Sequence, residues 1–223
     1  MSSNLCSEFM LEPVIKRSGE IHSWELKKQS GYVKVFPDNK SDVNVLNFAP
    51  LQQTASLERA LHFVSSLPTD ITDAAPVTVN IGDESADYIL DNPAIMNVLL
   101  QRKFLRLGID SGCAEFRANS QMVRLRRLSQ LCPLWIDGFG EGSTNLTLLD
   151  RIPFEYIKIA PSFFYKHLNT HSLRHIVSHA SLACHGAIIC GIKNEEHLQA
   201  CWAAGAIAGQ GDYWLKHHYG DNH

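Results

Sequence analysis

A set of polar side chains stands where apolar segments of the sequence end, and together they could bind a divalent metal ion and a phosphate ester. Carboxylate and amide oxygens are the ligands that Mg²⁺ prefers, and a lysine beside them could stabilise the negative charge of a phosphate. The set consists of Glu25 in WEL, Asn80 in VNI, Asp137 in WID, Lys158 in YIKIA and Gln210 in GQG.

The same side chains also have structural explanations. Glu25 and Lys158 could form an ion pair that holds the mouth of the fold closed, and this is the favoured explanation for these two residues. Asn80 and Gln210 could satisfy backbone groups of loops. Asp137 could cap the turn that follows it. Residue types and spacing therefore leave metal chemistry and structural roles both open.

These side chains can meet only if neighbouring strands of one sheet carry them. Short apolar segments rich in β-branched residues alternate with amphipathic segments along the chain. Strands that are apolar throughout are typical of parallel sheets, so the expected fold class is α/β. In such folds the C-terminal ends of strands carry the chemistry. The expected strands are 21–26, 77–81, 104–109, 133–139, 154–160, 186–192 and 206–209.

Helices are expected between these strands. Asn92 followed by Pro93 predicts a helix start. Asn194, with acidic residues directly after it, predicts another, and Gly205 marks its end. Residues 27–55 are polar and poorly periodic and are expected to be mostly loop, whereas residues 57–67 show a helical apolar stripe. No linker or repeat is evident, so residues 1–223 are interpreted as a single domain.

Composition excludes several classes of protein. The chain has 223 residues, 45% of them hydrophobic, and a net charge of −3. This balance gives no reason to expect direct binding to nucleic acid or to an anionic membrane. No segment approaches the ~18 apolar residues of a membrane span, and no signal peptide is recognisable. The six scattered cysteines are expected to be reduced thiols, which makes a cytoplasmic protein the default expectation.

Histidines recur at every fourth position from His167 to His179. On one helix His167, His171, His175 and His179 would share a face, and an i, i+4 pair of histidines can bind zinc. The apolar stripe of this segment lies on the other side, so the histidine face is expected to be solvated. No cysteine or acid completes a ligand set, and no metal is predicted here.

The densest basic region of the chain gives candidates for a protein contact. A solvated helix face is the usual explanation of such a region, and a docking patch for an acidic partner is the alternative. The candidate contact residues are Arg117, Arg124 and Arg127.

The segment WIDGFGEGSTNLTLLDRIPFEYIKIAPSFF resembles the EAL domain, the fold of cyclic di-GMP phosphodiesterases. WELK stands where that family has its name motif, VNI is similar to its asparagine-bearing strand, and CGIKNEEHLQACWAAGAIAGQGDYW follows its last block. The resemblance covers nearly the whole chain in the right order. It implies a TIM-like (β/α)8 barrel with an irregular first strand, here with a shortened C-terminus.

The resemblance also implies which site residues are kept and which are replaced. Glu25, Asn80, Asp137, Lys158 and Gln210 fall on functional positions. By the same comparison, metal ligands are replaced at Gly108, Gly138 and Cys190, and Ser111, Lys193 and Gln29 replace two acids and a phosphate-binding arginine. A two-metal site concentrates about four positive charges that carboxylates must balance. The expectation is therefore a vestigial site without metal or cofactor, and no enzyme activity.

The function implied by the resemblance is regulatory. Stand-alone, degenerate EAL-like proteins of enteric bacteria bind the FlhD subunit of the flagellar master activator FlhDC, block its attachment to DNA, can promote its degradation and so repress motility. The chain is expected to act in the same way, through protein–protein contact. The alternatives are a receptor that binds cyclic di-GMP without hydrolysis and a residual cyclic di-GMP phosphodiesterase, although binding of cyclic di-GMP is not expected.

Overall fold

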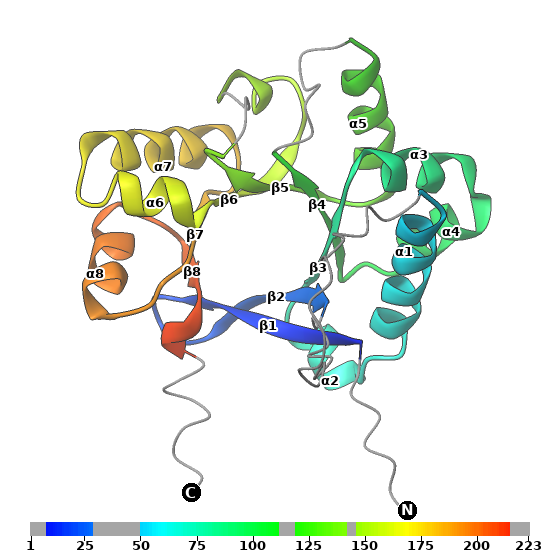
Figure 1. Ribbon diagram of the computed structural model, residues 1–223, viewed down its shortest axis with the longest axis horizontal. Helices are drawn as coiled ribbons and strands as arrows, with labels where there is room; N and C mark the ends of the chain where they lie inside the picture. The colour runs from blue at the N-terminus through cyan, green and yellow to red at the C-terminus, as the bar shows by residue number, and fades with distance from the viewer. Residues whose placement is uncertain (1–7, 29–49, 112–118, 142–145, 215–223) are drawn as a thin grey trace, which may run out of the picture.

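The structure is a computed structural model that describes residues 8–28, 50–111, 119–141 and 146–214. The strands close into a barrel in the order β1-β2-β3-β4-β5-β6-β7-β8 (Figure 1). This confirms the expected TIM-like barrel. The strands are β1 (Phe9–Lys16), β2 (Ile21–Lys28), β3 (Val77–Ile81), β4 (Leu105–Asp110), β5 (Leu134–Phe139), β6 (Phe154–Ile159), β7 (Ala187–Cys190) and β8 (Ala208–Gln210).

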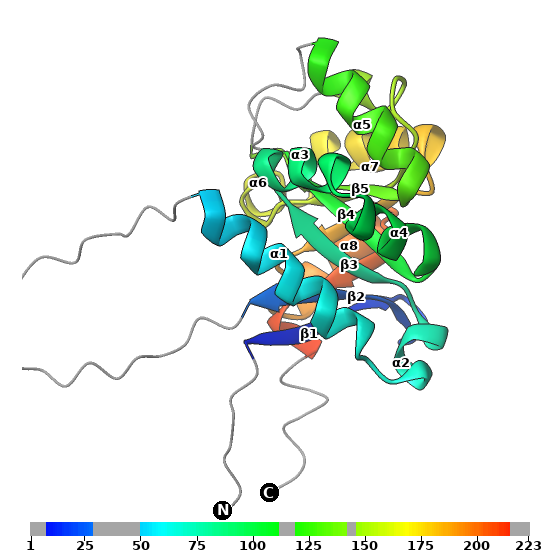
Figure 2. The same ribbon diagram turned by 90° about the vertical axis from the view of Figure 1, so that its right-hand side faces the viewer.

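Figure 1 shows the helices outside the barrel beside strands β3 to β8, and Figure 2 shows α1 running beside β2 and β3. No helix within the described ranges is both long enough and apolar enough to cross a bilayer. The helices are α1 (Pro50–Ser65), α2 (Thr69–Ala74), α3 (Asp83–Asp91), α4 (Pro93–Gln101), α5 (Asn119–Leu131), the short 3₁₀ helix η1 (Leu146–Leu148), α6 (Pro161–Lys166), α7 (His171–Ala183) and α8 (Glu195–Ala203).

The first strand is irregular, as expected from the resemblance. β1 runs antiparallel to both of its neighbours, whereas the pairs from β2 to β8 are parallel. It is paired with β2 along its length but with β8 only through Ile15 and Lys16. Pro13, which cannot donate a ladder hydrogen bond, lies in the part of β1 that pairs with β2 alone. The expected strand list lacked β1, because Glu12 and Pro13 interrupt its apolar pattern.

The barrel separates two apolar cores. Side chains alternate between the two faces of each strand, so one set fills the barrel and the other meets the helices. Val14, Trp135, Ile188 and Ala208 form a buried cluster of the inner set, below the polar residues of the mouth. The larger cluster lies between the strands and the helices. The inner core is small, which leaves the C-terminal mouth to polar side chains.

The predicted helix starts are confirmed. The Asn92 side chain accepts hydrogen bonds from the backbone N–H groups of Ala94 and Ile95. Asn194 accepts one from the backbone N–H of His197 at 2.9 Å. Gly205 follows α8 with a φ of +88°, which favours glycine. Asn92 thus starts α4 directly after α3, and Asn194 starts α8 after β7.

The predicted single histidine face is wrong. α7 begins at His171, whereas His167 caps the end of α6 and stacks on Phe163, with 4.3 Å between ring centroids. Between these helices Asn169 adopts a φ of +59°, which breaks the helical period. His179 is half-buried, and its Nε2 has no hydrogen-bond partner in the described part of the chain.

Candidate functional site

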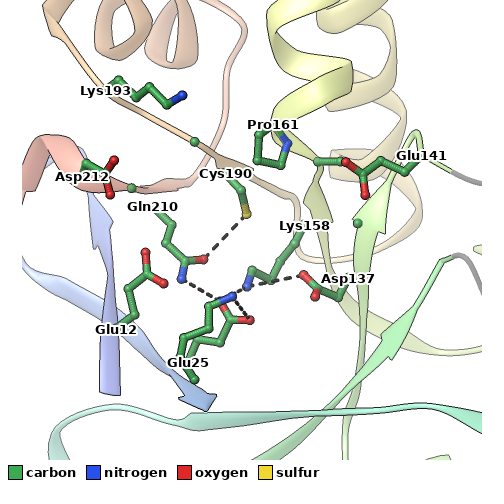
Figure 3. Close-up of a pocket in the computed structure, with 15 residues that line it drawn as sticks. Glu12, Glu25, Asp137, Glu141, Lys158, Pro161, Cys190, Lys193, Gln210 and Asp212 are labelled. Carbon is green, nitrogen blue, oxygen red and sulfur yellow. Dashed lines mark hydrogen bonds and ion pairs between the residues drawn. The ribbon is translucent and has the colours of Figure 1, made fainter. Parts of the chain in front are cut away.

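The polar residues selected from the sequence meet at one end of the barrel. Glu25 of β2, Asn80 of β3, Asp137 of β5, Lys158 of β6 and Gln210 of β8 come together at the C-terminal mouth, and Figure 3 shows most of them around Glu25. Each strand delivers an inward-facing side chain near its last residues, so parallel strands place the whole set in one layer. The sequence thus predicted the convergence correctly.

Glu25 is the centre of the network. Its side chain is 1% exposed. Its Oε1 accepts hydrogen bonds from Lys27 Nζ at 2.7 Å and Asn80 Nδ2 at 2.6 Å. Its Oε2 accepts from Lys158 Nζ at 2.5 Å and Gln210 Nε2 at 2.6 Å. A carboxylate offers about four acceptor positions. These donors therefore occupy the full acceptor capacity of Glu25.

Lys158 supplies the buried positive charge of the site. Its side chain is 1% exposed, and its Nζ lies 3.5 Å from Asp137 Oδ1 in addition to its contact with Glu25. Burial alone would lower the pKa of the ammonium, but Cys190 in its ionised form and the carboxylates of Glu25 and Asp137 raise that pKa above its ordinary value. Lys158 is charged at neutral pH, and the ion pair with Glu25 that the sequence favoured is present.

The carboxyl group of Glu25 is ionised for the complementary reason. Burial opposes its ionisation, but the charges of Lys158 and Lys27 outweigh burial and lower its pKa to about 2. A group with a lowered pKa binds fewer protons in the folded state than in the unfolded state above that pKa. Glu25 thus contributes stability at neutral pH that is lost only in strong acid.

Asn80 links the two carboxylates of the site. Its Nδ2 donates to Asp137 Oδ2 at 2.7 Å as well as to Glu25. Gln210 likewise directs its amide to Glu25. The interpretation of these two amides as partners of loop backbone is therefore replaced by a role as donors to buried carboxylate.

The structure around two of the replaced positions, Gly108 and Gly138, leaves no room or no suitable backbone conformation for a side chain. A Cβ at Gly108 would lie 1.9 Å from Asn80 Oδ1, so Asn80 occupies the space above this glycine. Gly138 has a φ of +70°, a conformation that costs other residues about 1 kcal/mol or more. Ser111, which follows β4, donates its hydroxyl to the carbonyl of Gly138 at 2.5 Å. Acidic side chains would not fit either position without local rearrangement.

Cys190, the third replaced position, carries a protonated thiol. Burial raises its pKa to about 12, although the nearby Lys158 acts in the opposite direction. The thiol lies 3.6 Å from Gln210 Oε1 and is oriented as its donor. Only a thiolate is an effective metal ligand, so Cys190 does not add one at neutral pH.

A pocket of about 290 Å³ lies over this network. It is lined by acids and by lysines, and Figure 3 shows Glu12 beside Gln210 and Lys193 at its rim. Burial raises the pKa of Glu12. Lys193 is exposed and lies 5.0 Å from the centroid of the Tyr165 ring. A second pocket, of about 340 Å³, lies between β2, β3 and α1, and Lys27 lines both.

These residues do not fit a divalent metal ion as they stand. Glu25 has no free acceptor position, and a buried ammonium lies between Glu25 and Asp137. In the described ranges no group of three or more His, Cys, Asp or Glu side chains is placed to hold a metal. Sequence reasoning missed Lys27 as a partner of Glu25. The signal was available, because residues two apart on a strand point to the same face.

The basic candidates separate in the structure. Arg124 bridges α5 to α3, with its guanidinium 3.3 Å from Asp83 and 2.9 Å from Asp87. Arg127 is exposed and donates to the carbonyl of Leu90 at 3.4 Å. Arg117 and Gln29 lie outside the described residues. Arg124 is therefore paired within the fold, and a docking role stays a prediction for Arg117, Arg124 and Arg127.

Comparison with known proteins gives consistent relatives. The EAL domain family matches residues 45–217. The cyclic di-GMP phosphodiesterase PdeH of Escherichia coli (strain K12) is 25% identical over 141 residues, which cover 60% of this chain and 52% of that protein. The chain thus spans about half the length of this curated relative.

Solved structures share the fold at low sequence identity. The EAL-like domain protein YdiV has a TM-score of 0.75 and 19% identity, over 92% of this chain and 89% of that one. The EAL domain of Mycobacterium smegmatis DcpA has a TM-score of 0.68 and 16% identity, over 91% and 89%. The PaMucR phosphodiesterase in complex with c-di-GMP has a TM-score of 0.59 and 18% identity, over 92% and 90%.

Proposed function

The chain belongs to the EAL domain family, and we propose that it is a non-catalytic member that acts by binding another protein. The observation that carries this proposal is the state of Glu25. Both of its oxygens are held by donors of the protein itself, two of which are lysine ammonium groups. An acid that is saturated in this way cannot serve as a metal ligand without breaking its own ion pairs.

The rest of the mouth supports the same conclusion. Hydrolysis of a phosphodiester by two metal ions needs several carboxylates to balance about four positive charges. Gly108 and Gly138 provide no side chain, and Cys190 holds a neutral thiol. Asp137 already faces the Lys158 ammonium at 3.5 Å. The proposed state of the site is vestigial: its charges are balanced internally.

The proposed partner is FlhD, the subunit of the flagellar activator FlhDC, and the proposed outcome is repression of motility. The support is the resemblance to degenerate, stand-alone EAL-like regulators, together with the fold shared with the EAL-like protein YdiV. In this proposal the protein works in the cytoplasm, contacts no nucleic acid directly and reaches DNA-bound targets only through its partner. The exposed Arg127 is the candidate contact residue on α5.

The first experiment is a calorimetric titration of cyclic di-GMP into the protein with Mg²⁺ or Mn²⁺ present, followed by chromatography of the cell contents. We expect no heat of binding and no linear dinucleotide. Heat without product would favour a receptor that uses the pocket over Glu25. Formation of product would overturn the proposal.

A pull-down with purified FlhD, and with FlhDC, tests the partner. We expect both to be retained by the wild-type protein. Arg127→Glu reverses the charge of an exposed side chain and should weaken retention, whereas Arg174→Glu on the exposed face of α7 is the matched control. Failure to retain FlhD would exclude this partner. The proposal that the protein is not a catalyst would still stand.

A further inference from the structure

We infer that Lys27 keeps divalent cations away from Glu25 Oε1, and that its removal opens a cation site formed by Glu25 Oε1, Asp137 Oδ2 and the amide of Asn80. Lys158 pairs with the other oxygen of each carboxylate and stays in place. The inference deepens the proposed non-catalytic function and rests on it. It concerns this chain in particular, because the lysine follows directly after WEL in the segment where the resemblance places the family's name motif.

The Lys27 ammonium occupies the outward side of Glu25 Oε1. Lys27 Nζ lies 2.7 Å from Glu25 Oε1. Mg²⁺ binds its oxygen ligands at about 2.0–2.1 Å, so an ion on the outward side of this oxygen and the Lys27 ammonium would overlap. Two cations so close would also repel each other strongly. Lys27 and a divalent ion therefore compete for the same side of Glu25.

The proposed cation site lies where oxygens of Glu25 and Asp137 meet at the Asn80 amide. Asn80 Nδ2 is within 2.6 Å of Glu25 Oε1 and 2.7 Å of Asp137 Oδ2, so these two carboxylate oxygens converge on the amide. An amide group can present either its nitrogen or its oxygen by turning over. After such a turn, two carboxylates and one amide oxygen surround a single point. One or two carboxylates with several waters is the usual protein environment of Mg²⁺.

The two lysines on Glu25 differ in how they can be removed. Lys158 is 1% exposed and holds the other oxygen, whereas the Lys27 side chain is 42% exposed. Loss of Lys27 leaves Glu25 paired with Lys158 and therefore leaves no buried charge without a partner. Lys27 also lines the pocket over Glu25 and the second pocket between β2, β3 and α1, so a neutral side chain there admits solvent and ions.

The test compares Mn²⁺ binding by the wild-type chain, Lys27→Met and Lys28→Met. Lys28 is the matched control, because it is 54% exposed and its Nζ lies 3.6 Å from Glu8 instead of Glu25. Free Mn²⁺ is measured by electron paramagnetic resonance at neutral pH and low salt. We expect Lys27→Met to bind one Mn²⁺ at least about tenfold more tightly than the other two proteins, the order of effect for one removed adjacent charge.

A second variant separates a real site from a general change in surface charge. Adding Asp137→Asn to Lys27→Met removes one proposed ligand from a side chain that is 26% exposed, and should abolish the gain in Mn²⁺ affinity. Circular dichroism spectra of all variants establish that each is folded.

The outcomes distinguish this inference from the proposed function. Equal Mn²⁺ affinity of the wild-type and Lys27→Met proteins would overturn the role of Lys27 and leave the absence of catalysis standing. Tight Mn²⁺ binding by the wild-type chain, lost in Asp137→Asn, would overturn both. A gain in Lys27→Met that survives Asp137→Asn would overturn the proposed ligand set.

Discussion

The two ends of the barrel interior both contain a partly or fully buried ion pair, but they are built on different principles. At the mouth, flexible polar side chains from several strands converge on Glu25, and its pair with Lys158 is 1% exposed on both sides. At the opposite end, Arg106 contacts Glu155 at 2.6 Å with side chains 16% and 20% exposed.

Rigid rings surround the ion pair at this opposite end. Trp135 Nε1 donates to Glu155 at 2.7 Å, and Tyr156 meets Trp135 edge-on at 5.0 Å. The comparison teaches that the far end is sealed by apolar packing with a polar rim. Among the described residues, the layer around Glu25 at the mouth is polar, and its charges balance one another. The same ion-pair chemistry therefore has different consequences at the two ends.

The largest expected difference comes from removing one partner of each pair. Lys158→Met leaves the buried Glu25 carboxylate without its main counter-charge and should lower the free energy of unfolding by about 3–5 kcal/mol. Arg106→Met leaves Glu155 with the Trp135 donor and some solvent, and should cost less than half as much. Urea denaturation of both variants measures this contrast. Equal losses would show that the mouth does not depend on charge balance.

Acid should affect the two ends in a fixed order. Burial, with a smaller contribution from Lys16, lowers the pKa of His22 from 6.5 to about 4, and His22 lies edge-on to Tyr156 at the far end. Its unfolded form binds a proton first, so the stability that neutral His22 contributes is present above pH 6.5 and is lost as the pH falls towards 4.

The corresponding loss at the mouth comes later. The pKa of Glu25 is lowered from 4.5 to about 2, so its contribution is present above pH 4.5 and is lost as the pH falls towards 2. Thermal melts of the wild-type chain and His22→Phe over this range test the order. We expect His22→Phe to remove the dependence of the melting temperature on pH above pH 4.5 and to leave that dependence unchanged below pH 4.5. An unchanged upper slope would contradict the assignment to His22.

The smallest expected effect concerns the glycines of the mouth. Gly138→Ala places a Cβ at a φ of +70° and 3.3 Å from Ser111 Oγ, and should cost about 1–2 kcal/mol. Gly82→Ala is the control, since a Cβ there meets nothing within 4 Å and its φ is −98°. Chemical denaturation compares the two. If Gly138→Ala left the stability unchanged, this turn would tolerate a side chain, and the backbone at Gly138 would not by itself exclude an acid.

Local sequence signals were sufficient where one segment decides the structure. The caps at Asn92 and Asn194 act on backbone only a few residues away, and the apolar strands fixed which polar residues reach the mouth. The sequence could also predict the ion pair of Glu25 and Lys158, because parallel strand ends share one edge.

Local sequence patterns failed where the partners of a side chain come from distant segments of the chain. Arg124 belongs to a basic run in the sequence, but its partners Asp83 and Asp87 come from α3, and no local pattern connects them. The histidine repeat was broken by the single residue Asn169. The amide of Asn80 was assigned to loop backbone, whereas its carboxylate partners lie 55 and 57 residues away.

The network around Glu25 also has a mechanical consequence. β1 stands between β2 and β8, yet Gln210 of β8 reaches across the lumen to Glu25 of β2, and Lys158 reaches it from β6. The backbone seam between β1 and β8 consists of two residue pairs. If β1 detached from β8, the side chains of Glu25, Lys158 and Gln210 would still cross-link β2, β6 and β8 through the lumen.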